Sequence, residues 1–158
     1  MGFGGIEGPE KKKRLVWSMA LLAGVVVAAG AATMAVTDYL RSQDPIYQCV
    51  ADPLEQPYQL SVPISVTEDG APAVVRAGVG VSDGCTLPVH TLEENVIHVA
   101  WKEPYGFTLG HFVYNWLGQD LVKYDTTAYV NNQQHEGSIL DIPLRQGDSI
   151  RLELATRN

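Results

Sequence analysis

Residues 15 to 36 read LVWSMALLAGVVVAAGAATMAV and carry no charged side chain over 22 positions. A helix of this length, rising about 1.5 Å per residue, would cross the roughly 30 Å hydrocarbon core of a bilayer. We therefore predict a transmembrane helix here. A cleaved signal peptide is the alternative interpretation, because it also has a basic start, an apolar run and small residues, but its apolar run is only about 7 to 15 residues long.

The charges that flank this run predict its orientation. Residues 11 to 14 are Lys and Arg, and Asp38 follows the run. Excess Lys and Arg keep one side of a membrane helix cytoplasmic. We expect a single-pass protein of the cell membrane, with a cytoplasmic tail over residues 1 to 14, a linker over 37 to 57, and a periplasmic or extracellular domain over 58 to 158.

Small side chains recur at every fourth position of the predicted membrane helix. They are Ala20, Gly24, Ala28 and Ala32. Residues at this spacing lie on one helix face, and small residues there allow a second helix to approach closely. Small residues are also frequent in membrane helices in general, so both a packing face and a chance pattern fit the spacing.

The segment after the helix is acidic. From Ser42 onward it contains 6 Lys and Arg against 15 Asp and Glu, a balance of 6 − 15 = −9. Phosphate contacts need cationic groups, so we expect no nucleic-acid partner. An acidic surface would instead attract a basic soluble carrier protein.

Both cysteines, Cys49 and Cys85, follow the membrane segment. Disulfides form and persist in oxidising compartments outside the cytoplasm. We therefore predict a disulfide between them. Two free thiols or two metal ligands are the alternatives.

Alternating apolar and polar residues predict a β sheet in the exported segment. Strands are expected at residues 60–67, 73–81, 96–101, 128–130 and 149–155, with Asp69-Gly70 turning the first hairpin. Between them, Thr108 can cap a short helix that Gly118 ends. The expected fold class is α+β: a membrane helix followed by a small mixed-sheet domain with one short helix, for which a β-grasp arrangement is one candidate.

One stretch holds a candidate metal site. Residues 84 to 99, GCTLPVHTLEENVIHV, contain His90, Glu93 and His98. Two imidazoles and a carboxylate with one open position would suit zinc, copper or iron. The alternative is structural, with His98 on a strand and His90 bonding a turn, and on that interpretation no cofactor is expected.

The same stretch carries a resemblance. Residues 84 to 117 resemble an uncharacterised family of exported or membrane-anchored domains whose pattern is Cys, His-Thr-His-Asp, Gly-x-Ile-His-Val-Glu, Phe-Thr-Leu-Gly-x-Phe-Phe and Trp-Gly. The matching positions are Cys85, His90-Thr91, 97–99, 107–110, Phe112 and Trp116. The chain departs from this pattern where it has Leu92 for the second His, Glu93 for Asp and Asn95 for Gly. If the family's histidines bind a metal, the resemblance implies that much of that site is lost here.

No sequence motif of an enzyme is present. There is no Gly-x-Ser-x-Gly elbow, no phosphate-binding loop, no dinucleotide fingerprint and no Cys-x-x-Cys. Aromatic residues instead crowd into the region after residue 100, and four of them are candidate interface anchors. These four are Trp101, Tyr105, Phe107 and Trp116.

These observations favour a binding role over catalysis. We expect a non-catalytic accessory subunit that docks on integral-membrane subunits in the lipid bilayer. Respiratory and photosynthetic electron-transfer complexes are the first candidates, by analogy with their small one-helix subunits. The alternatives are an extracytoplasmic metal-binding domain and an anchored receptor or assembly factor.

Overall fold

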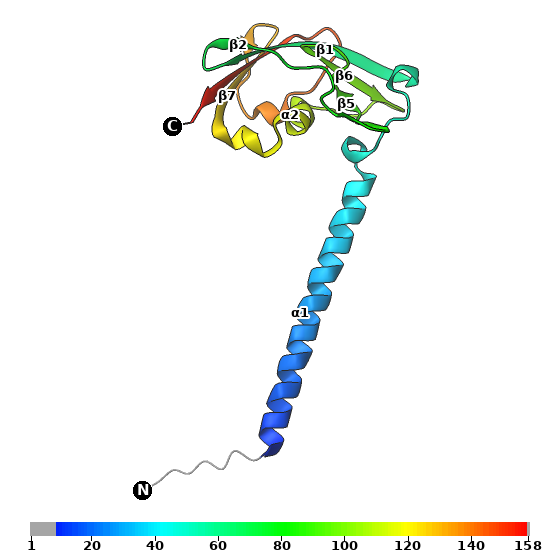
Figure 1. Cartoon of the computed structure of the whole chain (residues 1–158), viewed down its shortest axis with the longest axis vertical. Helices are drawn as coiled ribbons and strands as arrows, with labels where there is room; N and C mark the ends of the chain where they lie inside the picture. Colours follow the sequence, from blue (N-terminus) through cyan, green and yellow to red (C-terminus); the bar gives the residue numbers. More distant parts are fainter. Residues whose placement is uncertain (1–8, 158) are drawn as a thin grey trace. The chain divides into compact units, whose positions relative to one another are not determined.

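The computed structural model describes residues 9 to 157 and divides the chain into two compact units, residues 1–43 and 44–158. The first unit consists of helix α1 (Pro9–Gln43) (Figure 1). The predicted tail lies outside the described residues as far as residue 8, and its remainder is helical. The helix also includes the first seven residues of the predicted linker, because no proline lies between Pro9, at its start, and Pro45.

Within α1, the segment Met19–Leu40 is long and apolar enough to cross a membrane, and none of it is buried. Its 22 residues correspond to a helix of about 33 Å. An N-terminal signal sequence meets the same criterion of length and composition. The structure therefore confirms a helix able to span a membrane. Its orientation in a membrane is predicted only from the charges that flank it in the sequence.

The second unit is the α+β domain that the sequence predicts. Its helical segments are η1 (Pro45–Tyr47), η2 (Pro53–Glu55), α2 (Leu109–Leu117), η3 (Gly118–Lys123) and η4 (Ile139–Asp141), where η denotes a 3₁₀ helix. Its strands are β1 (Tyr58–Glu68), β2 (Ala71–Ala73), β3 (Val81–Ser82), β4 (Cys85–Thr86), β5 (Val89–His90), β6 (Val96–Trp101), β7 (Tyr124–Val130), β8 (Gln133–Gln134) and β9 (Ile150–Thr156).

Strand β1 organises the main sheet. Among the described residues the sheet has seven strands in the order β5-β6-β1-β9-β7-β8, with β2 paired to the end of β1. The first half of β1 pairs antiparallel with β6, and its second half pairs in parallel with β9. Strands β3 and β4 form a separate two-stranded sheet. The sheet is therefore mixed, and the first and last long strands of the domain are neighbours.

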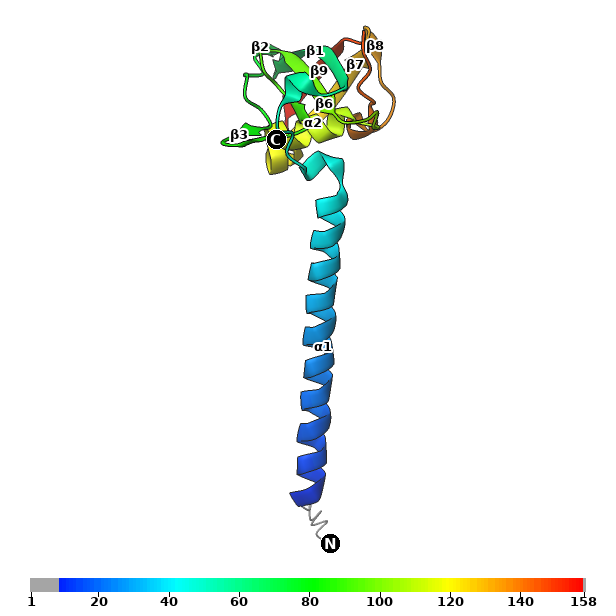
Figure 2. The ribbon, with the colours of Figure 1, turned by 90° about the vertical axis from the view of Figure 1, so that its right-hand side faces the viewer.

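One face of the sheet forms the core with α2. Every second residue of β1 from Leu60 to Val66 is buried, as the alternation predicts. Helix α2 lies along that face, and its Leu109, Phe112 and Val113 are fully buried (Figures 1 and 2). Gly118 ends the helix with a φ of 54°. This left-handed conformation suits a glycine, and the sequence placed the helix end correctly.

The predicted hairpin is shorter than expected on its returning side. Strand β2 ends at Ala73, whereas the sequence suggested a strand to Val81. Gly78 and Gly80 adopt φ values of 92° and 73°, which a regular strand does not use. The chain from residue 76 to residue 80 instead follows β5, where Thr91 exchanges backbone hydrogen bonds with Gly78 and Val79.

Candidate functional site

The pairing of β5 with β6 brings His90 and His98 together. The two residues are direct partners in the antiparallel register, and their ring centroids are 6.0 Å apart. The flanking residues Val89, Ile97 and Val99 point into the core. Because side chains alternate along a strand, both imidazoles lie on the opposite face of the sheet. The register of β5 and β6 therefore places the two histidines side by side, which the sequence alone only suggested.

His90 is fully buried and neutral. Its Nδ1 is 2.8 Å from the Leu87 carbonyl oxygen, which can only accept, so Nδ1 carries the proton. Burial lowers the pKa of His90, and the hydrogen bond to Leu87 opposes this effect. The other ring nitrogen, Nε2, is buried without a hydrogen-bond partner among the described residues. It presents an unused lone pair.

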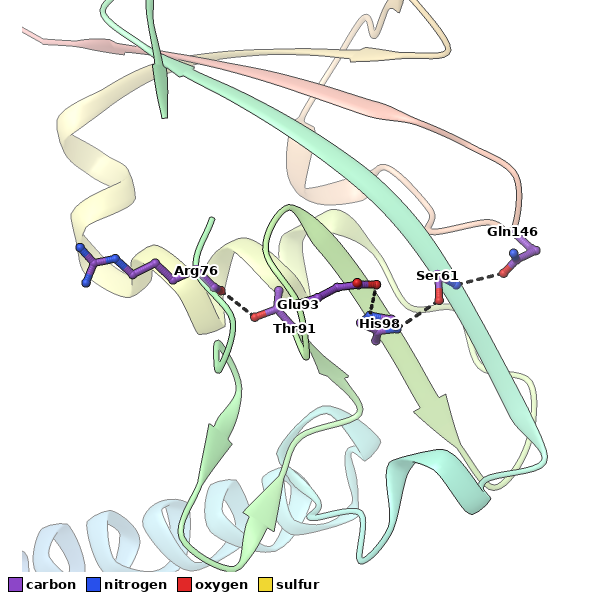
Figure 3. Close-up of polar contacts among 6 residues, drawn as sticks. All are labelled: Ser61, Arg76, Thr91, Glu93, His98 and Gln146. Carbon is purple, nitrogen blue, oxygen red and sulfur yellow. Dashed lines mark hydrogen bonds and ion pairs between the residues drawn. The ribbon is translucent and has the colours of Figure 1, made fainter. Parts of the chain in front are cut away.

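His98 stands in a line of polar groups that runs from β6 to β1 (Figure 3). The Ser61 hydroxyl lies 3.1 Å from its Nδ1, and Oε1 of Glu93 lies 3.5 Å from its Nε2. The backbone N–H of Ser61 donates to Oε1 of Gln146 at 2.9 Å, which holds that part of β1 in place. At 3.5 Å the contact with Glu93 is too long for a good hydrogen bond, and Nε2 is buried without one.

Thr91 fixes the end of β5, just before the turn that carries Glu93. Its hydroxyl donates to the Arg76 carbonyl at 2.8 Å (Figure 3). It also accepts from the Val79 N–H at 3.0 Å. The side chain is fully buried. These bonds tie the loop after β2 to β5. The side chain of Glu93, two residues further along, is exposed to solvent.

A cavity of about 30 Å³ lies beside the two imidazoles. Ser61, His90, Leu92 and His98 are among the residues that line it. Such a volume holds about one water molecule or ion. The line of carboxylate, imidazole and hydroxyl resembles a nucleophile with its base, but this cavity is too small to hold an organic substrate.

The three predicted metal ligands therefore lie near one another. However, no three His, Cys, Asp or Glu side chains between residues 9 and 157 are already placed to hold a metal ion. Two nitrogen donors are in position, and the Glu93 side chain, which is 67% exposed, is not.

The predicted disulfide is confirmed. Cys49 and Cys85 are bonded, with a separation of 36 residues. The bond joins the segment before β1 to strand β4, next to the backbone bridge between Val50 and Thr86. It anchors the start of the domain.

The aromatic residues divide into two groups. Trp101 and Phe107 are only 5% and 2% exposed, which excludes them as interface anchors, because a small domain needs its largest apolar side chains in its core. Tyr105 is 39% exposed and Tyr114 is 60% exposed. Trp116 is half-buried against the core. Of these aromatic residues, the exposed tyrosines remain available to a partner.

A second, larger pocket was not expected from the sequence. It has a volume of about 540 Å³, and Tyr47, Tyr105, His111, Tyr114 and Asp141 are among its lining residues. His111 is half-buried, and its Nδ1 accepts a hydrogen bond from the Thr108 backbone N–H at 3.1 Å. Burial lowers the pKa of His111 and raises that of Tyr105. The i, i+3 spacing of Thr108 and His111 was the only sequence signal of this capping contact.

Comparisons of the chain with protein families, curated proteins and solved structures found no match. The site therefore rests on its own geometry.

Proposed function

We propose that this protein is a non-catalytic, single-pass accessory subunit of a larger integral-membrane complex, and that α1 binds another membrane helix. The observation that carries the proposal is a shallow groove of about 590 Å³ along α1. Ala20, Gly24 and Ala28 line it between the larger side chains of Trp17, Leu21 and Val25.

The surface of α1 suits an apolar surrounding. Leu22 and Val26 are 67% and 68% exposed, and no part of the apolar segment is covered by the rest of the chain. The hydroxyls of Thr33 and Thr37 donate to the carbonyls of Ala29 and Thr33, each at 2.8 Å. These two polar side chains thus satisfy themselves within the helix, as lipid requires.

The groove supports a partner helix as well as lipid. A Cβ atom built on Gly24 would meet no side chain within 4 Å, so the groove is open at this position. Lipid tails are as apolar as leucine, so helices associate in a bilayer through close packing of this kind. Ala32 continues the four-residue spacing but does not line the groove.

The acidic domain would add contacts outside the membrane. Its balance of −9 favours basic partner surfaces, including a basic soluble carrier. Electron-transfer complexes, respiratory or photosynthetic, are the first class to test, by analogy with their small one-helix subunits. The basic residues before α1 favour a domain that lies outside the cytoplasm.

The test is purification of the full chain in mild detergent through a C-terminal tag, followed by mass spectrometry. We expect polytopic membrane proteins in constant ratio to the chain. Gly24→Leu fills the groove and is expected to lower their recovery about tenfold, the effect of about 1.4 kcal/mol in binding.

Gly30→Leu is the matched control. Gly30 lies about 120° around the helix from Gly24, and a Cβ there also meets nothing. Equal recovery with both variants would contradict helix packing and would favour an anchored receptor or assembly factor, for which α1 needs only lipid.

A further inference from the structure

We propose that His90 and His98 form a binding site for one divalent transition-metal ion of borderline softness, Zn²⁺ or Cu²⁺, which Glu93 completes by rotating onto the ion. This inference does not depend on the proposed accessory role. It concerns the outer face of β5 and β6, and it adds a metal centre to a domain for which the proposed function requires none.

The first argument is the pair of unused nitrogens. Nε2 of His90 and Nε2 of His98 are both buried, and neither has a hydrogen-bond partner among the described residues. A buried nitrogen left without a partner is unfavourable, because it has lost its hydrogen bond to water and gained none in the protein. Both histidines line one small cavity and their ring centroids are 6.0 Å apart, so a single occupant of that cavity could serve both nitrogens.

The second argument is the orientation of the rings. His90 donates its Nδ1 proton to the Leu87 carbonyl, so its Nε2 is the unprotonated nitrogen that a metal requires. The Ser61 hydroxyl lies 3.1 Å from Nδ1 of His98 and can accept a proton from it, which is the arrangement that a metal at Nε2 requires. Histidines that bind metals almost always bond a carbonyl, carboxylate or water through the other nitrogen, which fixes the ring and its tautomer. Here the orienting partners are already in place.

The third argument is the distance between the atoms that would bind the ion. Two ligands 2.0 to 2.2 Å from one tetrahedral ion lie about 3.3 to 3.6 Å apart. Oε1 of Glu93 lies 3.5 Å from Nε2 of His98, but Glu93 does not line the cavity, so its side chain must rotate while keeping about this separation to complete the site. Glu93 is mostly exposed and can rotate toward His90 without disturbing the core.

The donor set selects the class of ion. Two imidazoles and one carboxylate leave an open position for water and match Zn²⁺, while the same nitrogens bind Cu²⁺ more tightly in the usual order of divalent ions. Neither Ca²⁺ nor Mg²⁺ fits, because both prefer oxygen ligands.

The test uses the full chain in detergent with an affinity tag that contains no histidine. The protein is stripped with a chelator, loaded with Zn²⁺ or Cu²⁺, separated from free ion and analysed for metal. We expect about one ion per chain. The electron paramagnetic resonance spectrum of the Cu²⁺-loaded, unmodified protein should show hyperfine splitting from two nitrogens. His98→Gln is expected to weaken binding at least about 100-fold, and Glu93→Gln about tenfold.

His135→Gln is the matched control, because His135 does not line the cavity. Leu92→His is the opposite test, since Leu92 lines the cavity and a third imidazole there should tighten binding. Failure to retain an ion, a Cu²⁺ spectrum without nitrogen coupling, or equal losses in the His98 and His135 variants would overturn the proposal. Because the spectrum is recorded on the unmodified protein, it tests the proposal even if His98→Gln does not fold.

Discussion

Helices α1 and α2 are both rich in apolar residues, yet they expose them in opposite ways. Leu22 in α1 is 67% exposed, whereas Leu109 in α2 is fully buried. The apolar residues of α2 lie on one face, which a protein core can cover, while those of α1 lie all around the helix and need an apolar solvent. The distribution of apolar side chains, more than their number, separates a membrane span from a core helix.

The largest expected effect comes from removing the same side chain in the two helices. Leu109→Ala should lower the free energy of unfolding of the domain by about 2 to 5 kcal/mol, because it leaves a cavity in a closed core. Leu22→Ala should change it by about 0.5 kcal/mol or less. Tryptophan fluorescence during denaturant unfolding of the full chain in detergent measures both. Similar losses would contradict the separation of the two units.

The disulfide marks where the folded domain begins. Replacing Cys49 and Cys85 together by Ser should lower the free energy of unfolding by about 3 to 4 kcal/mol, since the closed loop of 36 residues restricts the unfolded chain. Reduction of the unmodified protein should have the same effect. The helix content of α1, followed by circular dichroism, should stay constant. A loss of α1 helicity on reduction would show that the two units are coupled.

Two glycines near α2 test how tightly this helix packs against η4. A Cβ on Gly110 would lie 2.5 Å from the Leu140 carbonyl oxygen, whereas a Cβ on Gly106 would meet nothing. Gly110→Ala should therefore cost about 1 to 3 kcal/mol through overpacking between α2 and η4, and Gly106→Ala much less. Thermal unfolding of both variants checks this. Equal melting temperatures would mean that η4 shifts freely.

The smallest expected effect is a dependence on pH that α1 does not share. Burial lowers the pKa of His90, so below about pH 6.5 the unfolded chain binds a proton that the folded domain excludes. Stability should thus be full above about pH 6.5 and fall on acidification, by at most about 1.4 kcal/mol per pH unit from this residue. The pKa of His111 is also lowered by burial, so its contribution has the same sign.

Unfolding midpoints measured across this pH range give the slope. His90→Gln should reduce it. An increase in stability on acidification would show that the folded domain gains a proton at His90, which would also be incompatible with an unprotonated metal ligand there.

Several features of the domain were predictable because they depend on short stretches of sequence. The alternation over residues 60–67 correctly identified β1, and Thr108 and Gly118 correctly marked the two ends of α2. Asn95 shows a subtler case. Its φ of 61° is one that asparagine tolerates better than most residues, so the residue type suits the turn before β6.

The candidate site was predictable only in part. Sequence spacing identified His90, Glu93 and His98 as a group, but the partnership of the two histidines depends on the register of β5 and β6. The roles of Leu87 and Ser61 depend on backbone positions that no motif encodes. Trp101 and Phe107 were wrongly predicted as interface residues, because aromatic clusters look alike in a core and on a surface until the sheet is assembled.

By itself the sequence determined the apolar span, the strand and helix periods and the disulfide, since each follows from local composition or from having only two cysteines. Tertiary structure alone decided the parallel pairing of β1 with β9, the short β2, and the burial of two imidazoles beside one cavity. These features join residues far apart in the chain. Their free energy depends on register and on the exclusion of water, which exist only once the sheet has formed.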